Sequence, residues 1–313
     1  MSSPNPSPKS LKYEPRHPRF TLDKDLILPT KTRQMLDEAI GALKFHKIIY
    51  TDWGFQAVDP AGRNMAINLY GPPGTGKTLA AEALAGSLGL EFIPIAISEI
   101  ESKFVGETAK NISTAFQEAA LSGALLFFDE ADTLLGARLS SVTQGIDNEI
   151  NAMRSTMLIE LERFEGVVAF ATNFAKNYDS AFVSRLRYHI EFQLPGLEER
   201  QRLWDRMLVA SIPLSMDRET LIASAAELSE GFSGREIRTA LRTALPRVLM
   251  EKAVNPQLGW SHLNSAINDI VQAKNHVGKV TNPADSSNAR SSKAALAMLG
   301  IKNQTTALDK QED

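Results

Sequence analysis

The sequence predicts an α/β fold, in which a parallel β-sheet flanked by helices is followed by a small domain built only of helices. Three observations support this prediction. Short apolar segments alternate with amphipathic segments over the first two thirds of the chain, as expected for strands joined by helical crossovers. A glycine-rich loop separates the first predicted strand from the next helix. After Leu194-Pro195-Gly196 the strand pattern ends and only helical patterns remain.

Short apolar runs mark the predicted strands. They lie at residues 66–70, 91–96, 124–128, 167–171 and 188–192. Residues 28–50 and 147–164 carry apolar side chains at helical spacing and are predicted helices. In the second domain, Ser233 followed three positions later by Glu236 predicts a capping box at a helix start.

Composition divides the chain into four parts. Residues 1–22 are rich in proline and serine, and we expect a flexible arm there because such a segment buries little apolar surface. Residues 23–195 are the predicted α/β nucleotide-binding domain, and residues 196–276 are the helical domain, called the lid below. Residues 277–313 are polar and linker-like, so we expect a flexible tail.

Charge and composition exclude several functional classes. The 313-residue chain has a net charge of −3 and a pI near 6.0, so no overall positive field attracts nucleic acid. It has no cysteine, which excludes disulfides and thiolate metal sites. No apolar run approaches the roughly 18 residues of a membrane span, and the first residues lack the apolar centre of a signal peptide. We therefore expect a cytoplasmic protein without a membrane or direct nucleic-acid partner.

The glycine-rich loop carries the strongest chemical signal. It fits the pattern G-x-x-x-x-G-K-[ST], in which backbone N–H groups turn inward around phosphates at the start of a helix. The lysine of this pattern reaches the β- and γ-phosphates of ATP, and the hydroxyl residue that follows holds Mg²⁺. The residues are Gly71, Pro72, Pro73, Gly74, Thr75, Gly76, Lys77 and Thr78. A strand before the loop and a helix after it are what such a nucleotide site requires.

Two carboxylates follow the apolar run at 124–128. Asp129 is predicted to bind Mg²⁺ through its water shell, and Glu130 to act as general base toward the attacking water. The plainer alternative is an acidic strand end that caps the next helix. The next strand leads to Asn173, whose amide can orient the same water, although an asparagine at a strand end is more often a turn residue. Together with the glycine-rich loop, these residues predict ATP hydrolysis.

The order of these features resembles the AAA+ ATPases over roughly residues 23–275. The resemblance implies a ring, expected to be a hexamer, in which an arginine of one subunit reaches the γ-phosphate bound by its neighbour. Arg185 and Arg187 are the candidates for this arginine finger, and Arg185 is preferred. Outside the family context, an arginine at this place would be an ordinary surface residue.

A segment after the second predicted strand is similar to the pore loop by which hexameric AAA+ unfoldases grip a polypeptide. Its residues are Lys103, Phe104, Val105 and Gly106. An aromatic side chain on a glycine-hinged loop can wedge between substrate side chains without demanding a particular sequence. Taken alone, Phe104 would be a core residue. Residues 137–145 are a weaker candidate for a second, polar pore loop.

Two further stretches are similar to the pachytene checkpoint AAA+ remodellers, which act on HORMA-domain proteins. They are Asp179-Ser-Ala-Phe-Val-Ser-Arg185 and Glu230-Gly-Phe-Ser-Gly-Arg-Glu-Ile237. The resemblance makes Arg235 the lid arginine that senses ATP; the alternative is an arginine that decorates an exposed first helical turn. Because only about 22 residues precede the ATPase module, the resemblance implies a minimal bacterial member, whose relatives regulate antiviral second-messenger signalling.

The predicted function is therefore an ATP-driven remodeller that partly unfolds or switches a HORMA-domain protein, with ATP and Mg²⁺ as cofactors. Three alternatives remain open. The first is a general AAA+ unfoldase or disassembly factor with a non-HORMA substrate. The second is a DNA-directed AAA+ loader, against which the acidic pI argues. The third is a ring that acts as a nucleotide-gated scaffold without moving a substrate.

Overall fold

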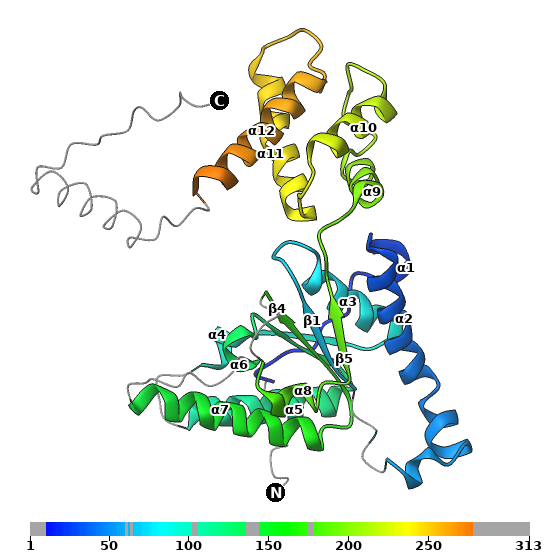
Figure 1. Cartoon of the computed structure of the whole chain (residues 1–313), viewed down its shortest axis with the longest axis vertical. Helices are drawn as coiled ribbons and strands as arrows, with labels where there is room; N and C mark the ends of the chain where they lie inside the picture. The colour runs from blue at the N-terminus through cyan, green and yellow to red at the C-terminus, as the bar shows by residue number, and fades with distance from the viewer. Residues whose placement is uncertain are drawn as a thin grey trace, which may run out of the picture.

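The computed structural model describes residues 11–59, 62, 65–101, 106–135, 144–173 and 178–277. Figure 1 shows an α/β domain and, beyond its last strand, a lid whose described part consists of helices. The lid sits above the end of the sheet at which the glycine-rich loop follows β1. This arrangement brings the two domains together at the predicted nucleotide site.

Within the described residues, the strands form one five-stranded sheet in the order β2-β3-β4-β1-β5, with every neighbouring pair parallel. The strands are β1 (Met65–Tyr70), β2 (Phe92–Ala96), β3 (Leu125–Asp129), β4 (Val167–Thr172) and β5 (Tyr188–Glu191). Each end lies within one residue of its predicted position, and the α/β class is confirmed. Because all strands are parallel, β1, β3 and β4 deliver their following residues to the same edge of the sheet.

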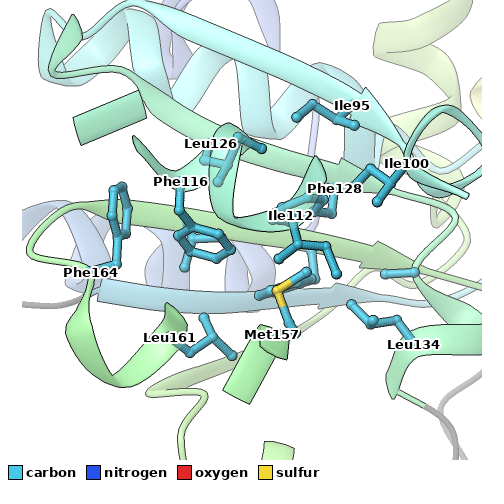
Figure 2. Close-up of a cluster of buried hydrophobic side chains, with 14 of the residues drawn as sticks. Ile95, Ile100, Ile112, Phe116, Leu126, Phe128, Leu134, Met157, Leu161 and Phe164 are labelled. Atoms are coloured by element: carbon cyan, nitrogen blue, oxygen red, sulfur yellow. The ribbon is translucent and has the colours of Figure 1, made fainter. Parts of the chain in front are cut away.

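Helices cover both faces of the sheet, as a parallel sheet requires. On one face lie α1 (Leu22–Asp25), α2 (Thr30–Lys44) and α3 (Lys77–Leu88); on the other lie α5 (Glu107–Ser122) and α7 (Gln144–Arg163). Figure 2 shows the core on the second face. There Phe128 of β3 stacks on Phe170 of β4 with ring centroids 5.3 Å apart, and Phe116 of α5 meets the edge of Phe164 at 5.2 Å. This core fixes β3 and β4 below the predicted catalytic residues.

Shorter elements complete the α/β domain. They are a π-helical turn (Ile48–Asp52), a 3₁₀ turn (Phe55–Ala57), α4 (Ile97–Ile100), α6 (Asp132–Leu135) and α8 (Ser180–Val183). The helix predicted over residues 28–50 is therefore interrupted, because α2 ends at Lys44 and the π-helical turn follows it.

The lid has its own apolar core. Its helices in the described region are α9 (Leu197–Met207), α10 (Arg218–Leu228), α11 (Gly234–Met250) and α12 (Trp260–Val277). They pack around fully buried Trp204, whose indole donates to Ser229 Oγ at 3.0 Å. The predicted capping box is present at the start of α11: Glu236 N donates to Ser233 Oγ, and the Glu236 carboxylate accepts from Ser233 N at 2.6 Å. The start of α11 is thus held firmly where it faces the other domain.

The flexible arm predicted over residues 1–22 is wrong for residues 11–22, which lie along the α/β domain. We call residues 11–29 the strap. Arg16 forms an antiparallel bridge with Phe92 on the edge strand β2, with N to O distances of 3.0 and 2.9 Å. Leu22 is fully buried against the core beneath α3.

Two buried carboxylates explain why this polar segment is ordered. Glu118 of α5 accepts from the backbone N–H groups of Lys12 and Tyr13, both at 2.8 Å. Glu82 of α3 accepts three hydrogen bonds from Arg19, through its backbone N, Nε and Nη2, at 2.9 to 3.0 Å. Charge-assisted hydrogen bonds of this kind are roughly twice as strong as neutral ones. They supply the stabilisation that the composition of residues 11–22 lacks.

Candidate nucleotide-binding site

The glycine-rich loop has the backbone geometry of a phosphate cradle. Gly71, Gly74 and Gly76 have φ values of +140°, +79° and +101°, a region that residues with a Cβ seldom adopt. A Cβ on Gly71 would lie 2.1 Å from the carbonyl oxygen of Phe192, so the start of the loop also passes too close to the neighbouring chain for any side chain. The loop then leads directly into α3 at Lys77, where free N–H groups favour an anion.

Lys77 is the first residue of α3 and is almost fully buried. Its Nζ donates to the carbonyl oxygens of Gly71 and Pro72, at 2.7 and 2.9 Å, and to Oδ1 of Asn173 at 3.0 Å. Burial lowers the pKa of Lys77, and the negative charge of Asp129 opposes that shift. Because its acceptors are neutral oxygens, a phosphate can replace them with a stronger, charge-assisted contact.

The hydroxyl of Thr78 and the carboxylate of Asp129 face each other across the site. Thr78 Oγ1 donates to Asp129 Oδ2 at 2.8 Å, which joins the start of α3 to the end of β3. Hard oxygen donors such as these are the ligands that Mg²⁺ prefers, together with the phosphates of a bound nucleotide. The pair therefore fits the predicted metal site. In the part of the chain that the structure describes, no cluster of three or more His, Cys, Asp or Glu residues offers a metal site independent of a nucleotide.

Glu130 follows Asp129 in an unusual backbone conformation. Its φ is +55°, one of two positive values among the non-glycine residues of the described chain, and its N–H donates to Asp129 Oδ1 at 2.9 Å. Such strained conformations occur preferentially at functional sites. The turn leaves Glu130 exposed at the edge of the cavity described below.

Asn173 is held beside these carboxylates by a residue that the sequence analysis missed. Its backbone N–H donates to Oδ1 of Asp132 at 2.9 Å, while its side chain accepts from Lys77. Asp132 stands three positions after Asp129, at the start of α6, so the acidic run ties the end of β3 to the end of β4. The sequence Asp-Glu-Ala-Asp shows a third carboxylate at Asp132, but it does not indicate that this carboxylate binds the backbone of Asn173.

These residues surround a cavity of 580 Å³ between the α/β domain and the lid. On the lid side, the backbone N–H of Arg235 donates to the carbonyl of Gly74 at 3.3 Å, and its side chain lines the cavity. The predicted residues Lys77, Thr78, Asp129, Glu130 and Asn173 also line it. Pro72 and Gly71 do not line the cavity, but they accept hydrogen bonds from Lys77 behind it.

Another part of the cavity was not foreseen. It is lined by the strap residues Asp25, Leu26, Ile27, Leu28 and Pro29 and, from α9, by Leu203, Arg206 and Met207. Arg206 donates to the carbonyl of Lys24 at 3.0 Å and to Asp25 Oδ1 at 3.2 Å, which connects the lid to the strap. Apolar side chains with a few polar groups suit the base of a nucleotide. The apolar residues of the strap show no periodic pattern in the sequence, so the sequence did not predict that they line the cavity.

Arg185 and Arg187 are remote from this cavity. Arg187 N donates to the carbonyl of Ala66 at the start of β1, whereas the glycine-rich loop begins at Gly71. Five residues of extended strand correspond to about 17 Å. The Arg185 side chain pairs with Glu162 of α7, with Nε at 2.8 Å from the carboxylate, and Arg187 lies over the ring of Tyr188. Neither arginine can therefore serve the cavity of its own chain in this arrangement.

The predicted pore loop is only partly described. Lys103, Phe104 and Val105 lie outside the described residues, as do residues 137–143 of the second candidate loop. Gly106 has a φ of +84° and immediately precedes α5. None of the described helices is long and apolar enough to span a membrane.

Comparison with known proteins identifies part of the chain. A family model described as "ATPase family associated with various cellular activities (AAA)" matches residues 67–194. The chain is 30% identical over 242 residues to the ATP-dependent zinc metalloprotease FtsH of Ureaplasma parvum, which covers 75% of this chain and 32% of that protein. It is 33% identical over 218 residues to 26S proteasome regulatory subunit 7 of Caenorhabditis elegans, with 67% and 48% covered. The chain thus spans less than half the length of these two relatives.

Solved structures agree on the fold. The FIGL-1 AAA domain superimposes with a TM-score of 0.62 at 20% identity, over 78% of this chain and 81% of that one. The same domain in complex with ADP gives a TM-score of 0.62 at 19% identity. The family match begins in β1 and ends just after β5, so it contains the glycine-rich loop, both carboxylates and Asn173. Residues 67–194 therefore form an ATPase domain of the AAA family.

Proposed function

We propose that this chain couples ATP hydrolysis in the cavity to the remodelling of a protein substrate, as one subunit of a ring. The observation that carries the proposal is the position of the cavity. It lies between two separately packed domains, with the glycine-rich loop on one side and Arg235 on the other. A nucleotide that contacts both domains changes their relative position when its γ-phosphate is lost.

In this proposal the triphosphate binds in the glycine-rich loop. There it replaces the carbonyl oxygens of Gly71 and Pro72 as the hydrogen-bond acceptor of Lys77 Nζ. Thr78 and Asp129 would hold Mg²⁺, which when bound neutralises phosphate charge. Glu130 accepts a proton from the attacking water, and the Asn173 side chain, freed from Lys77, orients that water. The apolar end formed by the strap and α9 receives the base.

The position of Arg185 supports the proposal of a ring. The domain needs a mobile cation at the γ-phosphate for fast hydrolysis, and Arg185 cannot reach the cavity of its own subunit. The half-buried Arg185 side chain, paired with exposed Glu162, can exchange that partner for a phosphate on a neighbouring subunit. Arg187 is the second candidate, but its side chain already lies over Tyr188. A hexamer is the arrangement we expect.

A polypeptide is the proposed substrate. The names of the two relatives, a protease and a proteasome regulatory subunit, both connect this type of domain with protein substrates. The Lys103–Gly106 segment between β2 and α5 would grip the chain, with Phe104 as the contacting side chain. The resemblance to pachytene checkpoint remodellers favours a HORMA-domain substrate in the bacterial cytoplasm, where its switching would control antiviral second-messenger signalling. A general unfoldase with a non-HORMA substrate is the second candidate.

The test begins with Glu130→Gln in the full chain. We expect this variant to bind ATP and assemble, while steady-state hydrolysis falls by about 10²-fold or more. Appreciable hydrolysis would remove Glu130 as the base. Capture of bound proteins by this variant in ATP, compared with ADP, identifies the substrate; a HORMA-domain protein supports the specific proposal, and a different protein supports the general unfoldase.

The pore segment has a separate test. Phe104→Ala is expected to retain ATP hydrolysis but lose remodelling of the captured substrate, because the aromatic contact is lost while the cavity is intact. Phe104→Tyr keeps an aromatic ring and is the matched control, expected to remain active. Unchanged remodelling by Phe104→Ala would exclude a gripping role for this residue.

A further inference from the structure

The lid lines the described cavity with three arginines, of which the sequence analysis predicted only Arg235. The other two are Arg206 of α9 and Arg238 of α11. Arg206 is already paired with Asp25 of the strap. The side chains of Arg235 and Arg238, by contrast, have no hydrogen-bond or ion-pair partner among the described residues, and both are exposed.

Arg235 and Arg238 are neighbours on one side of α11. Residues three apart on a helix have Cβ atoms about 5–6 Å apart, so two unpaired positive charges lie close together beside the cavity. Arg235 is anchored directly over the glycine-rich loop, since a Cβ on Gly74 would lie 2.8 Å from its own Cβ. Arg238 follows one turn further along and lines the same cavity.

No carboxylate among the described residues forms an ion pair with Arg235 or Arg238. Glu236, which lies between them in sequence, accepts from Ser233 and forms an ion pair with Lys274 of α12 at 2.8 Å. These hydrogen bonds hold the pKa of Glu236 below its ordinary value, although burial opposes them. Glu236 is therefore committed to the lid itself.

The charge of the cavity points to the missing partner. Its charged lining consists of Lys77, Arg206, Arg235 and Arg238 against Asp25, Asp129 and Glu130. Because Arg206 and Asp25 pair with each other, three cations remain opposite two carboxylates. A nucleotide polyphosphate supplies negative charge at this position and can accept from forked guanidinium donors.

We propose that Arg238 is a second lid arginine that binds phosphate oxygens of the nucleotide together with Arg235. The inference rests on the proposed ATP site. Two arginines one turn apart would hold the polyphosphate at two points, and thus fix the orientation of α11 relative to the glycine-rich loop. Arg238 acts in binding and positioning, and it does not take part in the chemical step.

The test compares Arg238→Gln with Arg242→Gln in the full chain. Arg242 lies one turn further along α11, is exposed and has no partner among the described residues, but it does not line the cavity. Equilibrium dissociation constants are measured for ATP and ADP with Mg²⁺, and for adenosine by competition. Loss of a charged hydrogen bond predicts a rise in Kd of about 10-fold or more for ATP with Arg238→Gln. ADP should follow in the same direction, whereas adenosine should be unaffected.

Several results would overturn the inference. It fails if Arg238→Gln binds ATP within about two-fold of the wild type, or no worse than Arg242→Gln. An equal loss for adenosine would place Arg238 on the base or ribose and would also contradict it. If the wild-type chain itself does not bind ATP, the proposed function fails instead, so the two failures are distinct. Because the Arg238 side chain has no partner to lose, the urea midpoint should be unchanged, and Arg238→Lys should recover part of the affinity.

Discussion

Replacing Gly86 by alanine tests whether the strap is an integral part of the nucleotide-binding domain. Gly86 lies inside α3, where alanine is ordinarily better than glycine by about 1 kcal/mol. Here, however, a Cβ would lie 2.1 Å from the backbone carbonyl oxygen of Phe20 in the strap. A backbone atom cannot rotate away, so the strap must shift by about 1 Å to restore an ordinary contact distance.

The cost of that shift follows from the contacts on either side of Phe20. Arg19 makes three hydrogen bonds to Glu82, and leaving this buried acceptor without them costs about 1–3 kcal/mol. Leu22 is fully buried, and its exposure costs about 1.5–3 kcal/mol. If the hydrogen bonds to Glu82 and the burial of Leu22 are both largely lost, the higher helix propensity of alanine offsets only about 1 kcal/mol of this loss. We therefore expect Gly86→Ala to lower the free energy of unfolding by about 1.5–5 kcal/mol.

The matched control is Gly41→Ala in α2. A Cβ there would meet only a Phe45 ring carbon at 4.0 Å, an ordinary contact. This variant should be more stable than the wild type by roughly 0.5–1 kcal/mol. Urea unfolding followed by far-ultraviolet circular dichroism measures both changes. Stabilisation by Gly86→Ala similar to that of Gly41→Ala would show that the strap does not lie on α3.

Three further changes test other parts of the account. Hydrogen bonds from Arg19 hold the pKa of Glu82 below its ordinary value, so the stabilisation by this carboxylate is present at neutral pH and is lost as pH falls through the lowered pKa. Urea unfolding should therefore show Glu82→Gln less stable than the wild type at neutral pH, with the difference shrinking as the solution is acidified through that pKa. A pH-independent difference would contradict this. Trp204→Ala should destabilise the lid by about 3–5 kcal/mol in the same assay, whereas a loss below about 1 kcal/mol would mean that the lid core can collapse around the gap. Gly74→Ala should weaken ATP binding measured by titration, because its Cβ would displace Arg235; unchanged affinity would show that the lid tolerates that displacement.

The strands were predictable because each is a short apolar run bounded by polar or glycine residues. A strand that is buried on both faces consists of a continuous apolar run, so the ends of the run mark the ends of the strand. The predicted ends at 124–128 and 167–171 accordingly agree with β3 and β4 to within one residue. The glycine-rich loop was predictable for a related reason, since its positive φ angles need glycine. The strands and the glycine-rich loop depend on residues that are close in sequence, so a short stretch of sequence is enough to predict them.

The strap was not predictable from its own composition. Its order depends on Glu82 and Glu118, which lie on helices 63 and 105 or more positions away. Carboxylates on helices ordinarily face solvent, so no local pattern marks these two as buried acceptors. The apolar end of the cavity was missed for the same reason, because it forms only when the strap meets α9.

Arg206 and Arg238 were missed because an arginine on an amphipathic helix is usually part of a solvated face. Their significance depends on where the lid rests relative to the glycine-rich loop, which is a tertiary property. Arg235 was predicted only through the resemblance of its segment to a family motif, and its nucleotide-sensing role stays a prediction. Asp132 is part of the acidic run that follows β3, but its hydrogen bond to Asn173 depends on the register of β3 and β4. The sequence of the run alone therefore does not predict this contact.

We propose that Arg185 of a neighbouring subunit completes each ATP site, and ATP turnover by mixed assemblies tests this most directly. Glu130→Gln and Arg185→Ala are each expected to reduce turnover strongly when present alone, by about 10²-fold or more. Co-expressed and purified through two different tags, they should regain activity, because a subunit with intact Glu130 can then meet a neighbour with intact Arg185. In random head-to-tail assembly about a quarter of the sites are intact. Turnover by the mixed assembly that stays at the level of the separate variants would contradict the claim, as would full activity of Arg185→Ala alone.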